Sequence, residues 1–153
     1  LVLLDTSESS NDKVRGHDYT VMDLTRAATV LLAGALDRIG DPFAIHGFCS
    51  DGRHDVHYQR FKDFDQPYDD SVKARLAGMK GRLSTRMGAA LRHGARYRAQ
   101  QPKSKRVVFV VTEMADRAGS AGVLDPTFAA CGPAFVTLVT GLTILLYKED
   151  GWA

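Results

Sequence analysis

Two short runs of apolar residues, each followed by a polar residue, constrain the fold of this chain most. Leu1–Leu4 is wholly apolar and is followed by Asp5, and the run 107–111 is wholly apolar and is followed by Thr112. A strand that is apolar at every position is buried on both faces, which is typical of the centre of a parallel sheet. The two runs therefore predict central strands of such a sheet.

Helical and strand patterns alternate between these runs. Thr20 and Asp23 resemble a capping box, apolar residues then recur at helical spacing as far as Ile39, and Gly40 is expected to end this helix. A second strand is predicted over 43–48 and an edge strand, with alternating apolar positions, over 55–61.

Two more helices are expected before the second apolar run. Asp70 is predicted to cap a short helix, and a third helix is predicted from near Thr85 to about Gln100. This alternation predicts an α/β fold with three layers, in which helices cover both faces of a mostly parallel sheet with one antiparallel edge strand.

The length of 153 residues fits one domain. A net charge of +2 with scattered basic residues argues against a nucleic-acid partner.

The run 134–147 has 14 residues, whereas a membrane-spanning helix needs roughly 20. We therefore expect a buried strand there and no membrane partner, and an interfacial segment stays open as an alternative. Cys49 and Cys131 lack metal-type spacing and favour a cytoplasmic, reducing location.

Asp5, Ser7 and Ser9 form a D-x-S-x-S pattern directly after the first apolar run. Ligands of open parallel sheets bind beyond the carboxyl ends of the strands, so these oxygens are expected to meet in one cavity. Thr85 precedes a predicted helix and can supply another hydroxyl at the same edge. Oxygen ligands with few charges predict Mg²⁺, with Mn²⁺ or Ca²⁺ as alternatives.

These motifs resemble the metal-ion-dependent adhesion site of von Willebrand factor A domains. Two stretches of the sequence look like the A domain of the CbbO and NorD proteins, and are most similar to CbbO. They read DPFAIHGFCSDGRHDVHYQRFKDFDQPYDD and GRLSTRMGAALRHG. The resemblance covers Leu1 to about Asp116, and 117–153 is divergent or truncated. We expect one von Willebrand factor A-type domain over 1–153. Because a strand begins at residue 1, without a Met or leader, this domain is expected to be a piece of a longer chain.

The resemblance implies a non-catalytic adaptor whose Mg²⁺ binds an acidic residue of a client protein. For a CbbO-like protein the partners would be the MoxR-type AAA+ ATPase CbbQ and the client Rubisco. For a NorD-like protein they would be NorQ and nitric-oxide reductase, and a chelatase-type A domain is a further alternative. The basic residues expected to assist partner binding at this edge are Arg53, Arg82 and Arg86.

The loop after the second apolar run departs from the family pattern T-D-G-E-P-A-D, in which the first Asp supports the metal from the outer shell. Here Thr112 is followed by Glu113, Met114, Ala115 and Asp116. Either Glu113 replaces that Asp, or the Asp-Gly pair is deleted and Glu113 to Asp116 align with E-P-A-D. Both interpretations make Glu113 and Asp116 candidate outer-shell residues and predict weaker Mg²⁺ binding.

An enzymatic alternative uses the same residues. Haloacid-dehalogenase-like phosphatases place a nucleophilic Asp after an apolar strand and need a second Asp two positions later. That position is Ser7, which favours an adaptor over an enzyme. The chain also lacks a G-x-x-x-x-G-K-[ST] phosphate loop.

Overall fold

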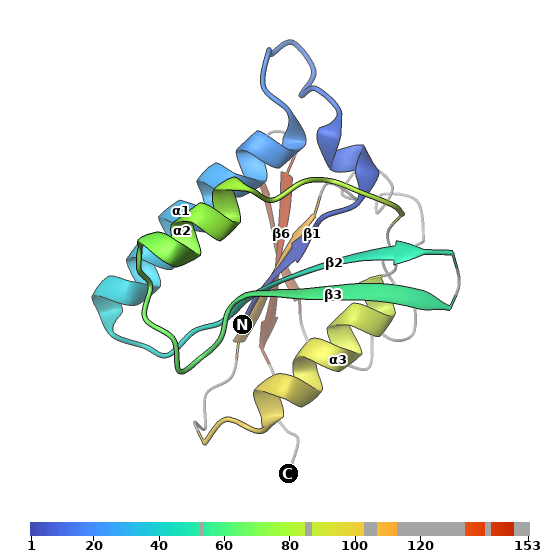
Figure 1. Cartoon of the computed structure of the whole chain (residues 1–153). Helices are drawn as coiled ribbons and strands as arrows, with labels where there is room; N and C mark the ends of the chain where they lie inside the picture. Colours follow the sequence, from blue (N-terminus) through green and yellow to red (C-terminus); the bar gives the residue numbers. More distant parts are fainter. Residues whose placement is uncertain (53, 85–86, 103–106, 113–133, 140–141, 149–153) are drawn as a thin grey trace.

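A computed structural model describes residues 1–52, 54–84, 87–102, 107–112, 134–139 and 142–148 (Figure 1). Its helices are η1 (Glu8–Asn11, a 3-10 helix), α1 (Val21–Ile39), α2 (Asp70–Ala77) and α3 (Met87–Ala99). Its strands are β1 (Val2–Asp5), β2 (Ile45–Asp51), β3 (Asp55–Lys62), β4 (Val107–Thr112), β5 (Ala134–Val139) and β6 (Leu142–Lys148).

The strands form one sheet in the order β3-β2-β1-β4-β6-β5. The predicted central strand β1 pairs in parallel with β2 on one side and with β4 on the other. At the edge, β3 pairs antiparallel with β2. The prediction of an α/β fold with a mostly parallel sheet and an antiparallel edge strand is therefore confirmed for these four strands.

The sheet continues beyond β4 in a way that the sequence did not suggest. A single buried strand was expected over 134–147, but β5 and β6 are separate strands that pair antiparallel, and β6 also pairs antiparallel with β4. Only residues 140–141 separate them, and a parallel connection needs a dozen residues or more, so this pair can only be antiparallel. The pairs β2–β3, β4–β6 and β5–β6 are all antiparallel, so the expectation of a single antiparallel edge strand is wrong for the whole described sheet.

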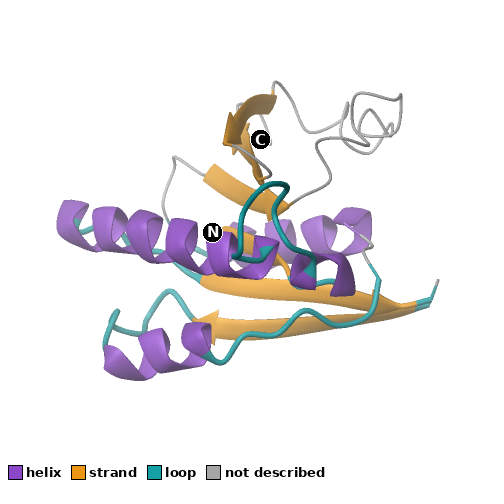
Figure 2. Cartoon of the chain, turned by 90° about the horizontal axis from the view of Figure 1, so that it is seen from above, coloured by secondary structure: helices purple, strands orange, loops and turns teal. Residues whose placement is uncertain are grey.

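Helices lie against both faces of the strands, as Figure 1 shows for α1 and α2 on one side and α3 on the other. Figure 2 shows the long helix α1 running alongside the sheet. Alternate residues of β1 point to opposite faces, so Val2 and Leu4 pack with α1 and α2, whereas Leu1 and Leu3 pack with α3. This division explains why every residue of the first run is apolar.

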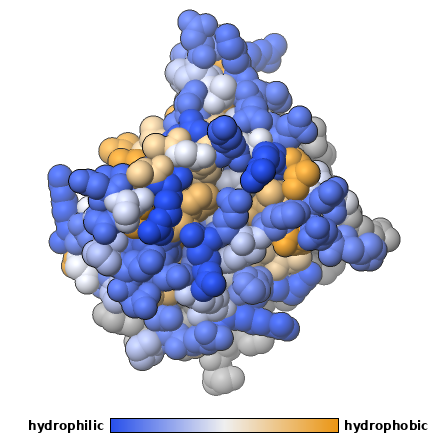
Figure 3. All heavy atoms as spheres, viewed as in Figure 1, coloured by the Kyte–Doolittle hydropathy of each residue, from blue (hydrophilic) through white to orange (hydrophobic). Residues whose placement is uncertain are grey.

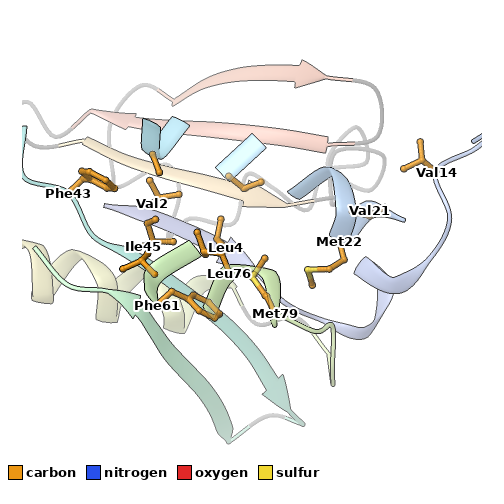
Figure 4. Packing of buried hydrophobic residues seen from close by; sticks show 13 residues of the cluster. Val2, Leu4, Val14, Val21, Met22, Phe43, Ile45, Phe61, Leu76 and Met79 are labelled. Carbon is orange, nitrogen blue, oxygen red and sulfur yellow. The ribbon is translucent and has the colours of Figure 1, made fainter. Parts of the chain in front are cut away.

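The larger core lies between β1, β2 and the two helices α1 and α2 (Figure 4). Leu4, Ile45 and Phe61 of the strands point toward Leu76 of α2 and Met79 (Figure 4). Each fully buried leucine side chain contributes on the order of 2 kcal/mol by removal from water. This core fixes β1 between its neighbours and so determines where Asp5 lies.

The ends of α1 follow the sequence signals. The side chain of Thr20 accepts a hydrogen bond from the backbone N–H of Asp23, and Asp23 accepts one from the backbone of Thr20, so the predicted capping box is confirmed. Gly40 ends the helix with φ of 78°, a left-handed conformation that glycine adopts at little cost.

Two boundaries differ from the prediction. The cap of α2 is Asp69 and not Asp70, because the Asp69 carboxylate accepts the backbone N–H of Val72 at 3.1 Å. The second strand begins at Ile45, later than expected, and continues to Asp51 because pairing with β3 extends to Asp55.

Hydrophilic residues cover most of the face drawn in Figure 3, with smaller apolar areas between them. Among the residues that the structure describes, no helix has the length and apolar character that a membrane crossing requires.

Candidate metal site at the carboxyl edge of the sheet

Asp5 is the last residue of β1 and carries the carboxylate of the candidate site. It is only 3% exposed, and its Oδ1 accepts a hydrogen bond of 3.0 Å from the backbone N–H of Ser7. A buried carboxylate is costly unless hydrogen bonds or a cation compensate for the lost water. The loop after β1 supplies the first of these contacts.

Ser7 lies at the start of η1, directly after the Asp5 segment, and Ser9 lies within η1. Their hydroxyl oxygens are 3.2 Å apart. Ser7 occupies the amino-terminal cap position of η1, but its side chain makes no capping hydrogen bond. The D-x-S-x-S pattern thus places two neighbouring hydroxyls on the segment whose backbone also bonds the Asp5 carboxylate.

Thr112, at the end of β4, also contacts the Asp5 carboxylate. The parallel register aligns Leu4 with Val111, which brings Thr112 to the level of Asp5. Its buried hydroxyl donates a hydrogen bond of 2.9 Å to Oδ2 of Asp5. The sequence analysis treated Thr112 only as the end of a strand. Its signal was a hydroxyl residue at the carboxyl end of the second fully apolar run.

The loop before α3 is attached to the same edge. The backbone N–H of Arg82 donates to the carbonyl of Thr6 at 2.8 Å, and that of Glu8 donates to the carbonyl of Leu83 at 2.7 Å. Ser50, at the end of β2, exchanges backbone hydrogen bonds with Ser84 of 2.7 and 2.9 Å. The chain that leads to Thr85 is therefore anchored to the ends of both β1 and β2.

Gly81 allows this close approach. A Cβ atom at this position would lie 2.4 Å from the hydroxyl of Ser10, 2.6 Å from the carbonyl of Ser7 and 2.8 Å from the side chain of Asn11. Real Cβ atoms do not approach other atoms so closely, so the contact between the two loops requires glycine here.

The other predicted site residues divide into two groups. Arg82 is exposed on the anchored loop, at the edge where it was expected. The remaining ones lie outside the described residues, and they are Thr85, Arg53, Arg86, Glu113 and Asp116.

The donor set fits a hard divalent cation. One carboxylate and two hydroxyls are the oxygen ligands that Mg²⁺ accepts, and Mg²⁺ usually keeps several waters when so few protein ligands are present. In the part of the chain that the structure describes, no group of three or more His, Cys, Asp or Glu residues could hold a metal ion. A site built from nitrogen or sulfur ligands, such as a typical zinc site, therefore has no support there.

A second polar cluster, which sequence reasoning missed, lies between α3 and the sheet. The ring nitrogens of the buried His46 lie 2.7 Å from the hydroxyl of Tyr58 and 3.3 Å from Oδ1 of Asp63. Tyr97 of α3 donates to the same oxygen of Asp63 at 2.7 Å, and His93 stacks edge-on against Tyr58. Only the packing of α3 on β2 and β3 brings these residues together.

Burial governs the protonation of this cluster. It lowers the pKa of His46 to about 4, although the neighbouring Asp63 favours the charged form. Burial also opposes ionisation of Asp63, but hydrogen bonds from Tyr97 and His46 and the charge of Arg60 lower its pKa. His46 is therefore neutral at pH 7, and the cluster fastens α3 to the sheet.

Known proteins match most of this chain. NorD of Stutzerimonas stutzeri is 34% identical over 113 residues, which is 74% of this chain and 18% of that protein. NorD of Brucella abortus is 34% identical over 112 residues, 73% of this chain and 17% of that protein. An uncharacterised protein of Pseudomonas aeruginosa is 34% identical over 113 residues, 74% of this chain and 18% of that protein. The chain is a distant homologue of NorD proteins.

The homology to NorD concerns one segment of much longer proteins, because the chain spans less than a fifth of the length of these relatives. No protein-family model matches the chain. No solved structure matches it either. The relation to NorD therefore rests on sequence similarity.

Proposed function

We propose that this chain is a von Willebrand factor A-type adaptor domain that binds a partner's carboxylate through Mg²⁺ in a NorD-like activation role. Asp5, Ser7 and Ser9 would hold the ion, with Thr85 as a further ligand. The observation that carries the proposal is the buried Asp5 carboxylate at the carboxyl edge, followed by two neighbouring hydroxyls, with the loop that leads to Thr85 attached there.

A site of this composition favours recognition over catalysis. A bound Mg²⁺ with few charged ligands supplies residual positive charge and a coordination position for an incoming carboxylate. Ser7 occupies the position where a phosphatase of the haloacid-dehalogenase type needs its second carboxylate, and a serine hydroxyl is a poor general acid or base at neutral pH. We therefore propose no enzymatic activity for this domain.

The proposed partners are a MoxR-type AAA+ ATPase and the client protein that it remodels. Arg82, exposed beside the site, would assist in binding an acidic residue of the client. The named relatives are NorD proteins, so the NorD-like role, with nitric-oxide reductase as the client, is favoured over the CbbO-like role with Rubisco.

The direct test is Asp5→Asn, which removes the charge but keeps an oxygen that can accept the Ser7 N–H. Calorimetry should show Mg²⁺ binding by the parent chain and none by Asp5→Asn. Asp18→Ala, which removes an exposed carboxylate elsewhere in the chain, is the control and should bind Mg²⁺ as the parent does. Circular dichroism should give the same spectrum for all three proteins.

The functional test places Asp5→Asn in a full-length protein that carries this domain. Activation of the client should be lost, whereas association with the ATPase and ATP hydrolysis should be retained. Unchanged activation, or hydrolysis of p-nitrophenyl phosphate by the parent chain and not by the variant, would contradict the adaptor role.

A further inference from the structure

We infer that Leu83 forms an apolar rim beside the candidate metal site, and that the partner segment bound there carries a large apolar residue next to its carboxylate. This inference rests on the proposed function, because it concerns the specificity of the same site. It adds a recognition element that the metal ligands do not provide.

The backbone places Leu83 beside the loop of the metal site. Its carbonyl accepts the N–H of Glu8, and the preceding residue Arg82 donates to the carbonyl of Thr6. Thr6 and Glu8 are the neighbours of Ser7 in the sequence, so the Leu83 backbone is bonded to the segment that carries the candidate ligands. The Leu83 backbone therefore lies at the same edge of the sheet as the candidate ligands.

The conformation of Leu83 is unfavourable for leucine. Its φ is 62°, and it is the one residue other than glycine with a positive φ among the described residues. The left-handed region is disfavoured for residues with a bulky side chain and is adopted far more readily by glycine or asparagine. Hydrogen bonds on both sides, at Arg82 and at Ser84, hold the backbone in this conformation.

The leucine side chain does not serve the core either. It is 38% exposed and belongs to neither buried cluster of the described part. A single exposed leucine is ordinary on a protein surface. Leu83 thus presents a partly exposed apolar side chain at a position whose backbone favours glycine, and a role in binding would account for it.

The neighbouring groups indicate the chemistry of the partner. Arg82 is exposed beside Leu83, and the candidate ligands Ser7 and Ser9 lie on the loop to which both are bonded. With the proposed Mg²⁺ bound, this surface would combine a cation, a guanidinium group and an apolar side chain. Its complement is an acidic residue with a large apolar neighbour in the same short segment.

The test uses capped tetrapeptides, because the partner segment is unidentified. Peptides with the centre Leu-Asp or Asp-Leu are compared with peptides in which serine replaces leucine, on the 153-residue chain at saturating Mg²⁺. NMR titration should show that the leucine peptides bind about fivefold more tightly, since partial burial of one apolar side chain gives part of the roughly tenfold or larger gain expected for full burial. The preference should disappear in Leu83→Asn, which suits the left-handed conformation and removes the apolar group.

Two controls separate the possible outcomes. Leu31→Asn, at a leucine that is 75% exposed on α1, should keep the preference, and Leu83→Asn should bind Mg²⁺ as the parent does. If both kinds of peptide bind equally well, and binding requires Mg²⁺ and Asp5, the inference about Leu83 is wrong and the proposed function stands. If no peptide binds in an Mg²⁺-dependent manner, both are overturned. A loss of preference in Leu31→Asn would also contradict the inference.

Discussion

The hydroxyl of Thr112 donates a hydrogen bond of 2.9 Å to Oδ2 of Asp5, and so joins the carboxyl ends of two neighbouring parallel strands. The other oxygen of the same carboxylate accepts the backbone N–H of Ser7 at 3.0 Å. Both Asp5 and Thr112 are almost fully buried. Contacts from the segment after β1 and from the end of β4 therefore orient the only carboxylate among the described candidate ligands.

Replacing Thr112 with valine, which has nearly the same shape, should destabilise the chain. The substitution removes a hydrogen bond to a buried carboxylate, and the loss of such a bond costs about 1–3 kcal/mol. Urea denaturation should show this decrease in the free energy of unfolding, and Mg²⁺ binding should weaken because Asp5 is less well oriented. Thr112→Ser keeps the hydroxyl and should retain most of the stability. Equal stability of Thr112→Val and the parent would contradict the role of this contact.

Gly81→Ala should separate the two loops of the site. The added methyl group would lie within 3 Å of Ser7, Ser10 and Asn11, so the loops must move apart at a cost of about 1–3 kcal/mol. Mg²⁺ affinity, measured by calorimetry, should fall together with stability. The matched control is Gly78→Ala, whose methyl group would meet only backbone oxygens at 3.6 and 3.7 Å. Similar behaviour of the two variants would show that the loops are not tightly apposed.

The stability of the chain should decrease as the pH falls from about 6.5 to about 4. Burial lowers the pKa of His46 from 6.5 to about 4, so in this interval the unfolded chain binds a proton that the folded chain does not. The free energy of unfolding should therefore rise with pH across this window, by up to about 3 kcal/mol from this residue. The pKa of Asp63 is lowered below its ordinary value of 3.8, so Asp63 adds a dependence of the same sign at the acid end of this window.

The control for this pH dependence is His46→Gln, which cannot titrate. Its stability should depend less steeply on pH between 4 and 6.5 when chemical denaturation is measured at several pH values. A slope as steep as that of the parent would mean that other groups cause the dependence.

Restoring the aspartate of the related pattern in the segment after Thr112 should strengthen Mg²⁺ binding. Glu113→Asp tests the interpretation that Glu113 replaces the Asp of the related pattern by a longer side chain. Replacement of Glu113-Met114 by Asp-Gly-Glu-Met tests the alternative, in which two residues are deleted. One of the two variants should bind Mg²⁺ more tightly by calorimetry, because it would place an aspartate carboxylate where the related pattern has one. Tight binding by the parent with no gain in either variant would refute both interpretations.

Local sequence signals predicted much of the fold. The capping box at Thr20 and the left-handed Gly40 are short-range features, so the bounds of α1 could be read directly. The cap of α2 was placed one residue late because Asp69 and Asp70 have equal capping propensity, and only the observed hydrogen bond to Val72 distinguishes them. The run 134–147 was not recognised as two strands, since strand pairing is a non-local property.

The candidate site likewise combines features that local spacing predicts with contacts between distant residues. Asp5, Ser7 and Ser9 lie within five residues, so their spacing alone indicated a common cavity. Thr112 is 107 residues away from Asp5, and its contact depends on the register of β1 against β4. The cluster of His46, Asp63 and Tyr97 likewise requires α3 to pack on the sheet.

The sequence by itself determined the buried central strands, the bounds of α1 and the local set of candidate oxygen ligands, because each depends on neighbours in the chain. The tertiary structure alone decided which distant groups surround that set. Strand register placed Thr112 on the carboxylate of Asp5, and a close approach that only Gly81 permits placed Leu83 at its edge. The physical reason is that register and loop contact are set by the packing of whole strands and helices, which no short stretch of sequence encodes.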